Sequence, residues 1–333
     1  MLKILVVAPA WIGDTILAQP LLSRLQEQHS HLVIDVLAGA WTAPLLRRMP
    51  EVRHVIDSPF RHGEFNLSGR WRLGRELARE GYDEVIVLPN SWKSALAPFF
   101  AGIPKRTGYT GEARYGLINN RHTLDKAALP RLADRYTRLA EDRRATHAHS
   151  VRRPHLKTSL AQQQAVHHAL GLPAGVTPII FCPGAEYGPA KRWPARHFAS
   201  LASVLHTPQH PVWLLGSPKD AEVGEEIARL CHGAALNLCG RTSLDQAVDL
   251  LATAKLVVCN DSGLMHVAAA LERPLVALFG SSSHNYTPPM SPRAKILSLD
   301  LECSPCFMRS CPLGHTNCLN DLTPERVLAS LRA

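Results

Sequence analysis

At 333 residues the chain is longer than one average domain, and its 46% hydrophobic and 20% charged residues are typical of a folded globular protein, which excludes a disordered chain. The formal net charge of +9 is confined to the first half: residues 1–160 hold 24 Lys and Arg against 15 Asp and Glu, whereas residues 161–333 hold 13 against 13. An aromatic content of 6%, without a helix-turn-helix, RRM or zinc-finger pattern, argues against nucleic acid as the partner of this charge.

Strand-like and helical stretches alternate along the first half, which predicts an α/β domain. The runs typical of strands are Lys3–Ala8, Leu32–Leu37, Arg53–Asp57 and Glu84–Leu88. Helical spacing covers Asp14–Gln28 and residues 42–48, 68–80 and 131–142. A polar stretch follows, and we place the domain boundary within 155–178, with residues 1–165 as the first domain.

The second half repeats the alternation, which predicts a second domain of the same class over residues 175–320. A buried strand at Ile179–Cys182 leads into a Gly- and Pro-rich loop that ends near Lys191. Further strands are predicted at Val212–Leu215 and Leu236–Cys239. Ser243 is expected to cap the next helix, and a last helix over residues 322–333 begins with Pro324 at its first position.

The most informative stretch is residues 256–286, which predicts a strand, a sharp turn, a helix and a second strand, a βαβ unit. The turn and the start of the helix carry a carboxylate, a hydroxyl, a glycine and an imidazole, on Asp261, Ser262, Gly263 and His266. Because the turn lies at the carboxyl end of a strand and at a helix N-terminus, these groups suit a phosphate or a ribose. A histidine on an Ala-rich helix is also typical of a protein core, so both interpretations of His266 stay open.

Three further residues are candidates at loop positions. Asp14 follows the first strand, where the G-x-G-x-x-G fingerprint of a dehydrogenase is missing; its carboxylate suits either a general base or a plain helix cap. Lys191 suits a diphosphate grip, and the alternative is an exposed surface lysine. Thr242, beside the predicted cap Ser243, is a further candidate for ligand contact.

Four cations of the basic half lie in loops after predicted strands, which in an open α/β sheet point to the ligand: Arg61, Lys93, Arg106 and Arg114. Phosphates, carboxylates and anionic lipids are the partners that such cations favour, and a merely solvated basic surface is the alternative. No signal peptide and no run of ~20 apolar residues occurs, so we expect a cytoplasmic protein.

Cysteines fall into two groups. Four are scattered and are expected to be reduced, largely core residues: Cys182, Cys231, Cys239 and Cys259. The other four cluster between Cys303 and Cys318, with Cys306 and Cys311 between them. Clustered cysteines in a cytosolic protein favour a metal over a disulfide, but this spacing matches no strong zinc pattern. Structural zinc, free thiols and disulfides therefore all stay open.

Several motifs occur in a fixed order, and together they are specific where each alone is weak. In this order, and over residues 1–330, the chain resembles the lipopolysaccharide heptosyltransferases of glycosyltransferase family 9. The motifs are Gly13-Asp14, Pro183-Gly184-Ala185 with Lys191-Arg192-Trp193-Pro194, and Asn260–His266 ahead of Arg273-Pro274. Within this family, the chain most resembles the members that act on an acceptor already carrying one heptose. This finer resemblance is seen in Leu88–Leu96, Arg106–Tyr109, Arg114–Leu117 and Pro183–Trp193.

The resemblance implies the GT-B fold, with two Rossmann-like doubly wound domains facing across a cleft, the first for the acceptor and the second for the donor. It implies inverting transfer of heptose from ADP-L-glycero-D-manno-heptose to the first heptose of heptosyl-Kdo2-lipid A, without a cofactor or a metal. Asp14 would be the base and Lys191 would hold the diphosphate. The donor phosphate and sugar would meet Asp261, Ser262, Gly263, Leu264 and His266.

The implied acceptor is a phosphorylated Kdo-lipid A heptoside, so the protein would lie peripherally on the cytoplasmic surface of the inner membrane. Its phosphates and carboxylates would give the basic first half a partner. The alternatives are a family member with another acceptor, type I or III, or a protein that binds a nucleotide sugar without catalysis. The acceptor, the heptose epimer and the oligomeric state are not specified by the sequence.

Overall fold

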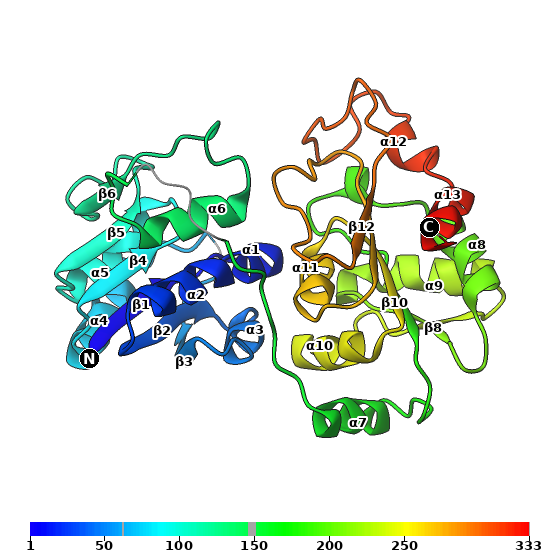
Figure 1. The fold of residues 1–333 in the computed structure, drawn as a ribbon, viewed down its shortest axis with the longest axis horizontal. Helices are drawn as coiled ribbons and strands as arrows, with labels where there is room; N and C mark the ends of the chain where they lie inside the picture. Colours follow the sequence, from blue (N-terminus) through cyan, green and yellow to red (C-terminus); the bar gives the residue numbers. More distant parts are fainter. Residues whose placement is uncertain (62, 146–150, 333) are drawn as a thin grey trace. The chain divides into compact units, whose positions relative to one another are not determined.

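The computed structural model describes residues 1–61, 63–145 and 151–332, and the chain divides into two compact units, Met1–Pro154 and His155–Ala333 (Figure 1). The division falls at the N-terminal edge of 155–178, the range in which the sequence predicts a boundary. Ala333, the end of the predicted helix 322–333, lies outside the described residues.

Unit 1 is a six-stranded parallel sheet in the order β3-β2-β1-β4-β5-β6. Its strands are β1 (Leu2–Val7), β2 (Leu32–Gly39), β3 (Val52–Ser58), β4 (Glu84–Val87), β5 (Lys105–Tyr109) and β6 (Asn120–His122). Its α-helices are α1 (Ile12–Leu17), α2 (Gln19–Gln28), α3 (Ala43–Arg47), α4 (Leu67–Leu77), α5 (Leu96–Phe100) and α6 (Leu132–Thr137). Short 3-10 turns are η1 (Ala78–Glu80), η2 (Trp92–Ala95) and η3 (Arg138–Ala140). The strand order reverses between β1 and β4, which is the topological switch point of this sheet.

The helix predicted over Asp14–Gln28 is interrupted in the structure. Helix α1 ends at Leu17 and α2 begins at Gln19, with Pro20 in its first turn. Proline has no backbone N–H, and its ring clashes with the carbonyl four residues earlier, so a continuous helix through Pro20 is disfavoured. The prediction of a single continuous helix was therefore wrong, since two helices cover this stretch.

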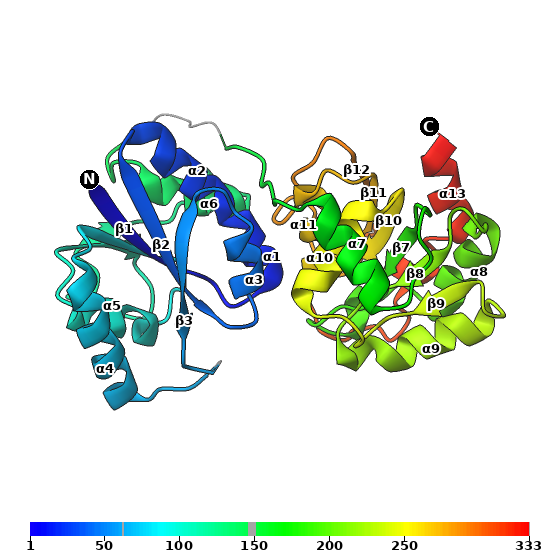
Figure 2. The ribbon, with the colours of Figure 1, turned by 90° about the horizontal axis from the view of Figure 1, so that it is seen from below.

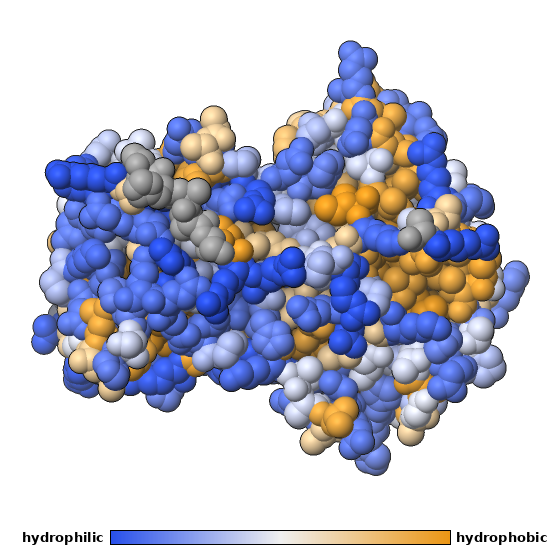
Figure 3. Space-filling view, in the orientation of Figure 1, coloured by the Kyte–Doolittle hydropathy of each residue, from blue (hydrophilic) through white to orange (hydrophobic). Residues whose placement is uncertain are grey.

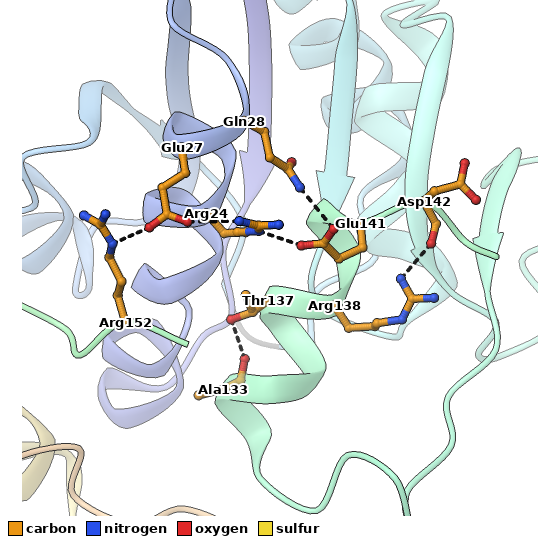
Figure 4. Close-up of polar contacts among 9 residues, drawn as sticks. All are labelled: Arg24, Glu27, Gln28, Ala133, Thr137, Arg138, Glu141, Asp142 and Arg152. Carbon is orange, nitrogen blue, oxygen red and sulfur yellow. Dashed lines mark hydrogen bonds and ion pairs between the residues drawn. The ribbon is translucent and has the colours of Figure 1, made fainter. Parts of the chain in front are cut away.

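Ion pairs between α2 and the segments after α6 bind the two ends of unit 1 together (Figure 4). Arg24 Nε donates to Glu141 Oε1 at 2.6 Å, and Arg24 Nη1 to Glu27 Oε2 at 3.1 Å. Gln28 also donates to Glu141, and Arg152 pairs with Glu27. Such partly exposed pairs contribute ~0.2–1 kcal/mol each to the free energy of unfolding. Their main effect is therefore to hold the segments after α6 against α2.

Unit 2 has the same topology, β12-β11-β10-β7-β8-β9, again all parallel. Its strands are β7 (Ile179–Cys182), β8 (Val212–Leu214), β9 (Ala235–Asn237), β10 (Leu256–Asn260), β11 (Leu275–Leu278) and β12 (Ala294–Leu297). Its α-helices are α7 (Leu160–Ala169), α8 (Ala195–Leu205), α9 (Ala221–Leu230), α10 (Leu244–Thr253), α11 (Gly263–Ala270), α12 (Asn317–Asn320) and α13 (Pro324–Arg332). Two 3-10 turns, η4 (Pro189–Lys191) and η5 (Pro218–Asp220), follow β7 and β8.

Helices cover both faces of each sheet, as in doubly wound folds (Figure 2). In unit 2, α7 and α11 pack on α10, whereas α9 and α13 pack on α8. Large buried side chains fill the core under α8, among them Phe181, Trp193 and Phe198. Ser243 caps α10 and forms a capping box with Gln246, which confirms the predicted cap.

The surface differs in character between the two units. Hydrophilic residues cover most of the face of unit 1 drawn in Figure 3, whereas apolar side chains gather on the same face of unit 2 around α13. Among the described residues no helix is both long and apolar enough to cross a membrane.

Candidate functional site

A lysine and an aspartate meet at the topological switch point of unit 2. Strands β7 and β10 are neighbours there, and the connections that leave them run to opposite sides of the sheet. Lys191 ends the loop after β7, and Asp261 directly follows β10. Lys191 Nζ donates to Asp261 Oδ2 at 2.5 Å, and Asp261 is 6% exposed. Open α/β sheets bind their ligands at this point, so the structure brings two predicted site residues together where a ligand is expected.

The geometry around Asp261 depends on residues that sequence reasoning did not select. Ser282, just after β11, donates from its hydroxyl to the same Oδ2 at 2.5 Å. Asn260, fully buried, accepts from the backbone N–H of Trp193 at 3.0 Å and donates to the Pro183 carbonyl at 2.7 Å. These hydrogen bonds hold the loops after β7, β10 and β11 together. The backbone that carries Lys191 and Asp261 is therefore fixed in position. The carboxyl-end rule applied to β11 would have found Ser282.

Three buried polar atoms near this ion pair have no hydrogen-bond partner within the part of the chain that the structure describes: Ser262 Oγ, His266 Nδ1 and Ser281 Oγ. Ser262 is the first residue before α11, yet its hydroxyl does not cap that helix. Leaving a buried polar atom unsatisfied costs ~1–3 kcal/mol, so such a cluster is typical of a site that is completed by a polar ligand. The backbone N–H groups at the start of α11 add the positive end of a helix dipole, which favours an anion.

His266 is neutral at physiological pH. Burial lowers its pKa to about 4, with a smaller raising effect from Asp261 and a smaller lowering effect from Lys191. A neutral imidazole offers one donor and one acceptor, so His266 suits a hydroxyl group rather than a pure anion. His266 lies in the first half of α11, which directly follows Asp261 and Ser262, and its unsatisfied Nδ1 adds to the same group of buried polar atoms.

The other donor-site predictions fall in two places. Gly263 and Leu264 are the first two residues of α11, directly after Ser262, and are partly exposed. Thr242 follows β9, an edge strand that β8 separates from β7, and this residue, beside the cap Ser243, is also partly exposed. The ring of Tyr187, a residue that sequence reasoning missed, lies 5.2 Å from Lys191 Nζ.

In unit 1, Asp14 lies in the first turn of α1, close to the carboxyl end of β1 and therefore to the switch point of this sheet. The residue at the cap position is Trp11, so the interpretation of Asp14 as the helix cap does not apply. Asp14 is partly exposed.

A partly open pocket lies at the carboxyl ends of β1, β2, β3 and β4, and its space of about 730 Å³ includes open solvent. Arg61 and Lys93, two of the four predicted acceptor contacts, line it together. The segment Ala8–Ala10, a few residues before Asp14, forms part of its wall. This pocket therefore gathers cations beside the segment that precedes α1, and Asp14 is not among the residues that line it.

Arg106 and Arg114 are not among the residues that line this pocket. Arg106, which lies in β5, donates to the carbonyls of Ile103, Leu117 and Gly116 at 2.7, 2.7 and 3.1 Å. Arg114 is 2% exposed and donates to the carbonyls of Pro89 and Tyr109, both at 2.6 Å. Both arginines shape the loops around β4 and β5, and their contact with an acceptor stays a prediction.

The four clustered cysteines line one small pocket, together with His315: Cys303, Cys306, Cys311 and Cys318. All four are free thiols. Among the residues described, no three His, Cys, Asp or Glu side chains are grouped so as to hold a metal ion. The loop that carries the cysteines packs on the ion-pair site, since Phe307 N donates to Ser281 O at 2.7 Å and Ala190 N to Arg309 O at 3.1 Å.

We predict that two of these thiols differ in reactivity. The Thr316 N–H donates to Cys311 Sγ at 3.4 Å and lowers the pKa of Cys311, whereas burial and the neighbouring thiols raise the pKa of Cys318. Because the thiolate is the nucleophile, Cys311 should be alkylated by iodoacetamide at a lower pH than Cys318. Mass spectrometry of a pH series measures this order, and elemental analysis of the same sample tests for bound metal. Equal profiles, or about one equivalent of zinc, would contradict the prediction.

A second prediction concerns acid stability. Burial lowers the pKa of His122 in unit 1 to about 4 from 6.5. Above pH 6.5 the folded and unfolded states bind the same number of protons here; as the pH falls from 6.5 to about 4, only the unfolded state takes up a proton. The free energy of unfolding should therefore fall by ~3 kcal/mol over this window for His122.

Hydrogen exchange of peptides from β4 to β6, measured between pH 7 and pH 4, follows this effect. His122→Gln removes the titrating group and should flatten the pH dependence, whatever it does to stability at pH 7. His31→Gln, at an exposed position, is the matched control and should keep the slope. An unchanged slope in His122→Gln would refute the assignment.

Two doubly wound units with a polar, cation-bearing site at the switch point of each are found together in glycosyltransferases of the GT-B class. Residues 70–317 match the model of glycosyltransferase family 9 (heptosyltransferase), so the chain belongs to this family and is a glycosyltransferase. This confirms the resemblance drawn from the motifs and the predicted α/β fold class.

Individual relatives match over the full length. Lipopolysaccharide heptosyltransferase 2 of Escherichia coli (strain K12) is 46% identical, covering 100% of this chain and 98% of the relative. Lipooligosaccharide heptosyltransferase 2 of Haemophilus influenzae (strain ATCC 51907 / DSM 11121 / KW20 / Rd) is 45% identical over 99% of this chain and 98% of the relative. The solved structure of E. coli ADP-heptose lps heptosyltransferase II has a TM-score of 0.89 at 44% identity and covers 99% of this chain and 98% of that one.

Proposed function

We propose that this chain transfers heptose from ADP-L-glycero-D-manno-heptose to the first heptose of heptosyl-Kdo2-lipid A during synthesis of the lipopolysaccharide inner core. The observation that carries the proposal is the Lys191–Asp261 ion pair surrounded by unsatisfied buried polar atoms at the switch point of unit 2. Support for the substrates comes from full-length relatives that are named lipopolysaccharide heptosyltransferases and from a solved structure whose name includes ADP-heptose.

On this proposal, unit 2 holds the donor. Lysine has three N–H donors, and Asp261 uses one of them, so two are left for the diphosphate. The N-terminus of α11, at Ser262 and Gly263, would receive further phosphate oxygens. The neutral imidazole of His266 would bind a hydroxyl of the heptose or ribose. Thr242 and Leu264 would lie at the edge of the donor.

The reaction would be a single displacement with inversion. The Asp14 carboxylate takes the proton of the acceptor hydroxyl, and the oxygen forms a bond to the anomeric carbon of the donor. The bond between that carbon and the β-phosphate oxygen breaks, and its electron pair leaves with ADP. Lys191 stabilises the charge that gathers on the departing diphosphate. Arg61 and Lys93 in the unit 1 pocket would bind the anionic groups of the acceptor.

The test compares two acceptors under one donor concentration. Release of ADP from ADP-heptose is measured with Kdo2-lipid A and with heptosyl-Kdo2-lipid A, and the anomeric configuration of the product is read by NMR. Release only with the heptosylated acceptor supports the proposal. Release of ADP with the unheptosylated acceptor would assign the chain to another type of the family. Tight binding of ADP-heptose without release of ADP would indicate a protein that binds the nucleotide sugar without catalysis.

A further inference from the structure

Unit 1 exposes four large apolar side chains around the start of α4, which we call the aromatic patch: Phe65, Leu67, Trp71 and Trp92. They are 45%, 47%, 56% and 42% exposed. Leu67 and Trp71 are four residues apart on α4 and share one face of the helix, whereas Leu73 on the opposite side is buried. Single exposed apolar residues are ordinary, but a group of this size marks an interaction surface.

A buried arginine fixes the backbone that carries the patch. Arg70 is 7% exposed and donates to the carbonyls of Phe65 at 2.6 Å, Glu64 at 2.9 Å and Lys93 at 2.9 Å. It thereby joins the loop before α4 to the loop after β4, and the rings of Phe65 and Trp92 lie 5.1 Å apart across this junction. The aromatic pair is held in place before any partner arrives, which lowers the entropic cost of binding.

Two exposed arginines lie beside the aromatic patch, Arg72 and Arg75, which follow Trp71 on α4. Residues 61–79 contain five arginines and two glutamates, and the carboxylates of Glu64 and Glu112 accept from the backbone N–H groups of Arg61 and Trp92. Tryptophan is enriched where lipid headgroups meet hydrocarbon, and arginine is attracted to anionic headgroups. A helix end that combines both has the chemistry of a surface that lies on an anionic bilayer.

The same two loops form one side of the unit 1 pocket. Arg61 and Gly63 from the loop before α4, and Ser91 and Lys93 from the loop after β4, line that pocket. The aromatic patch is therefore continuous with the pocket to which we assign the acceptor.

We propose that the aromatic patch, with Arg72 and Arg75, docks unit 1 onto a bilayer that contains anionic phospholipid. The proposal rests on the proposed function, because an acceptor anchored in that bilayer would then present its sugars to the adjoining pocket. It places a partner on residues that the transfer reaction itself does not use.

The experiment measures co-sedimentation of the full chain with vesicles of phosphatidylglycerol and phosphatidylethanolamine, and with vesicles of phosphatidylcholine alone. Wild-type protein should prefer the anionic vesicles, and the preference should weaken with salt. The double variant Leu67→Ser/Trp71→Ser should partition at least ~10-fold more weakly, since two side chains lose apolar contact. Arg72→Gln/Arg75→Gln should lose the dependence on anionic lipid. Thermal unfolding verifies that the variants fold.

A matched control removes exposed apolar groups from unit 2: Leu160 and Val204 are 75% and 61% exposed, and Leu160→Ser/Val204→Ser should bind vesicles as wild type does. With a water-soluble, deacylated acceptor every variant should keep wild-type turnover. Unchanged vesicle binding in Leu67→Ser/Trp71→Ser, equal binding to both vesicle types, or a wild-type dimer that this variant dissociates would each overturn the proposal. Because the vesicles contain no substrate, failure of the proposed transfer reaction would be seen separately, as absence of ADP release.

Discussion

Asp14→Asn should lower the turnover number ~10²-fold or more, the usual scale of acid–base catalysis. The amide cannot take a proton from the acceptor hydroxyl, while its size and position stay nearly the same. Asp14 lies in the first turn of α1 and is not the cap of that helix, and removing its charge there should cost ~0.3–1 kcal/mol of helix-dipole interaction. Steady-state ADP release measures the turnover number, and chemical unfolding measures the loss of stability.

Glu222→Gln is the matched control for this substitution. Glu222 is an exposed carboxylate in the first turn of α9 in unit 2, so its amide removes the same charge from an equivalent helix position away from the site. Turnover and ADP affinity should both equal those of the wild type. If Asp14→Asn turned over at a near-normal rate, the carboxylate would have only an electrostatic role in α1.

Lys191→Ala should weaken the binding of ADP and of ADP-heptose at least ~10-fold. A charge-assisted hydrogen bond to the diphosphate is worth ~1.5–3 kcal/mol, and the substitution also leaves the buried Asp261 carboxylate without its cation. Affinity for the acceptor should not change, because Lys191 belongs to unit 2. Titration of the folded variant with ADP measures the loss directly.

Lys219→Ala provides a close comparison, since Lys219 Nζ also pairs with a carboxylate, Glu186, at 2.5 Å. That pair is largely exposed, with 71% and 48% of the two side chains accessible, so its loss should leave nucleotide binding unchanged. Lys191→Ala/Asp261→Asn completes a double-mutant cycle that separates the ligand contact from the ion pair. ADP affinity equal to wild type in Lys191→Ala would exclude the surroundings of the Lys191–Asp261 ion pair as the donor site.

The central strands of both sheets were predictable because they are buried on both faces and read as apolar runs, as β10 does from Leu256 onward. The strands missed were those toward the sheet edges. Strand β5 contains Lys105, Arg106 and Gly108, and β12 is only partly buried, so neither shows such a run. These strands form because each pairs with an inner strand, β5 with β4 and β12 with β11. Such pairing is a tertiary contact, which the local sequence pattern does not reveal.

The site was predictable where topology alone decides it. Lys191 and Asp261 follow strands that neighbour each other in a doubly wound sheet, so the motif order was enough to bring them together. For Arg114 the sequence indicates a cation after a strand, but not that backbone carbonyls occupy its donors. Burial of an arginine depends on which loops fold over it, and this information lies in the three-dimensional packing.

The unsatisfied buried atoms of unit 2 have a consequence for inhibitor chemistry. A compound that binds beside Ser262, His266 and Ser281 meets buried polar atoms that have no hydrogen-bond partner within the described residues. An aromatic or aliphatic fragment would leave all three without hydrogen bonds and would lose in desolvation what it gains in apolar contact. Effective competitors of the nucleotide must therefore bring matched donors and acceptors, and screening libraries rich in flat hydrophobic scaffolds should give few hits at this site.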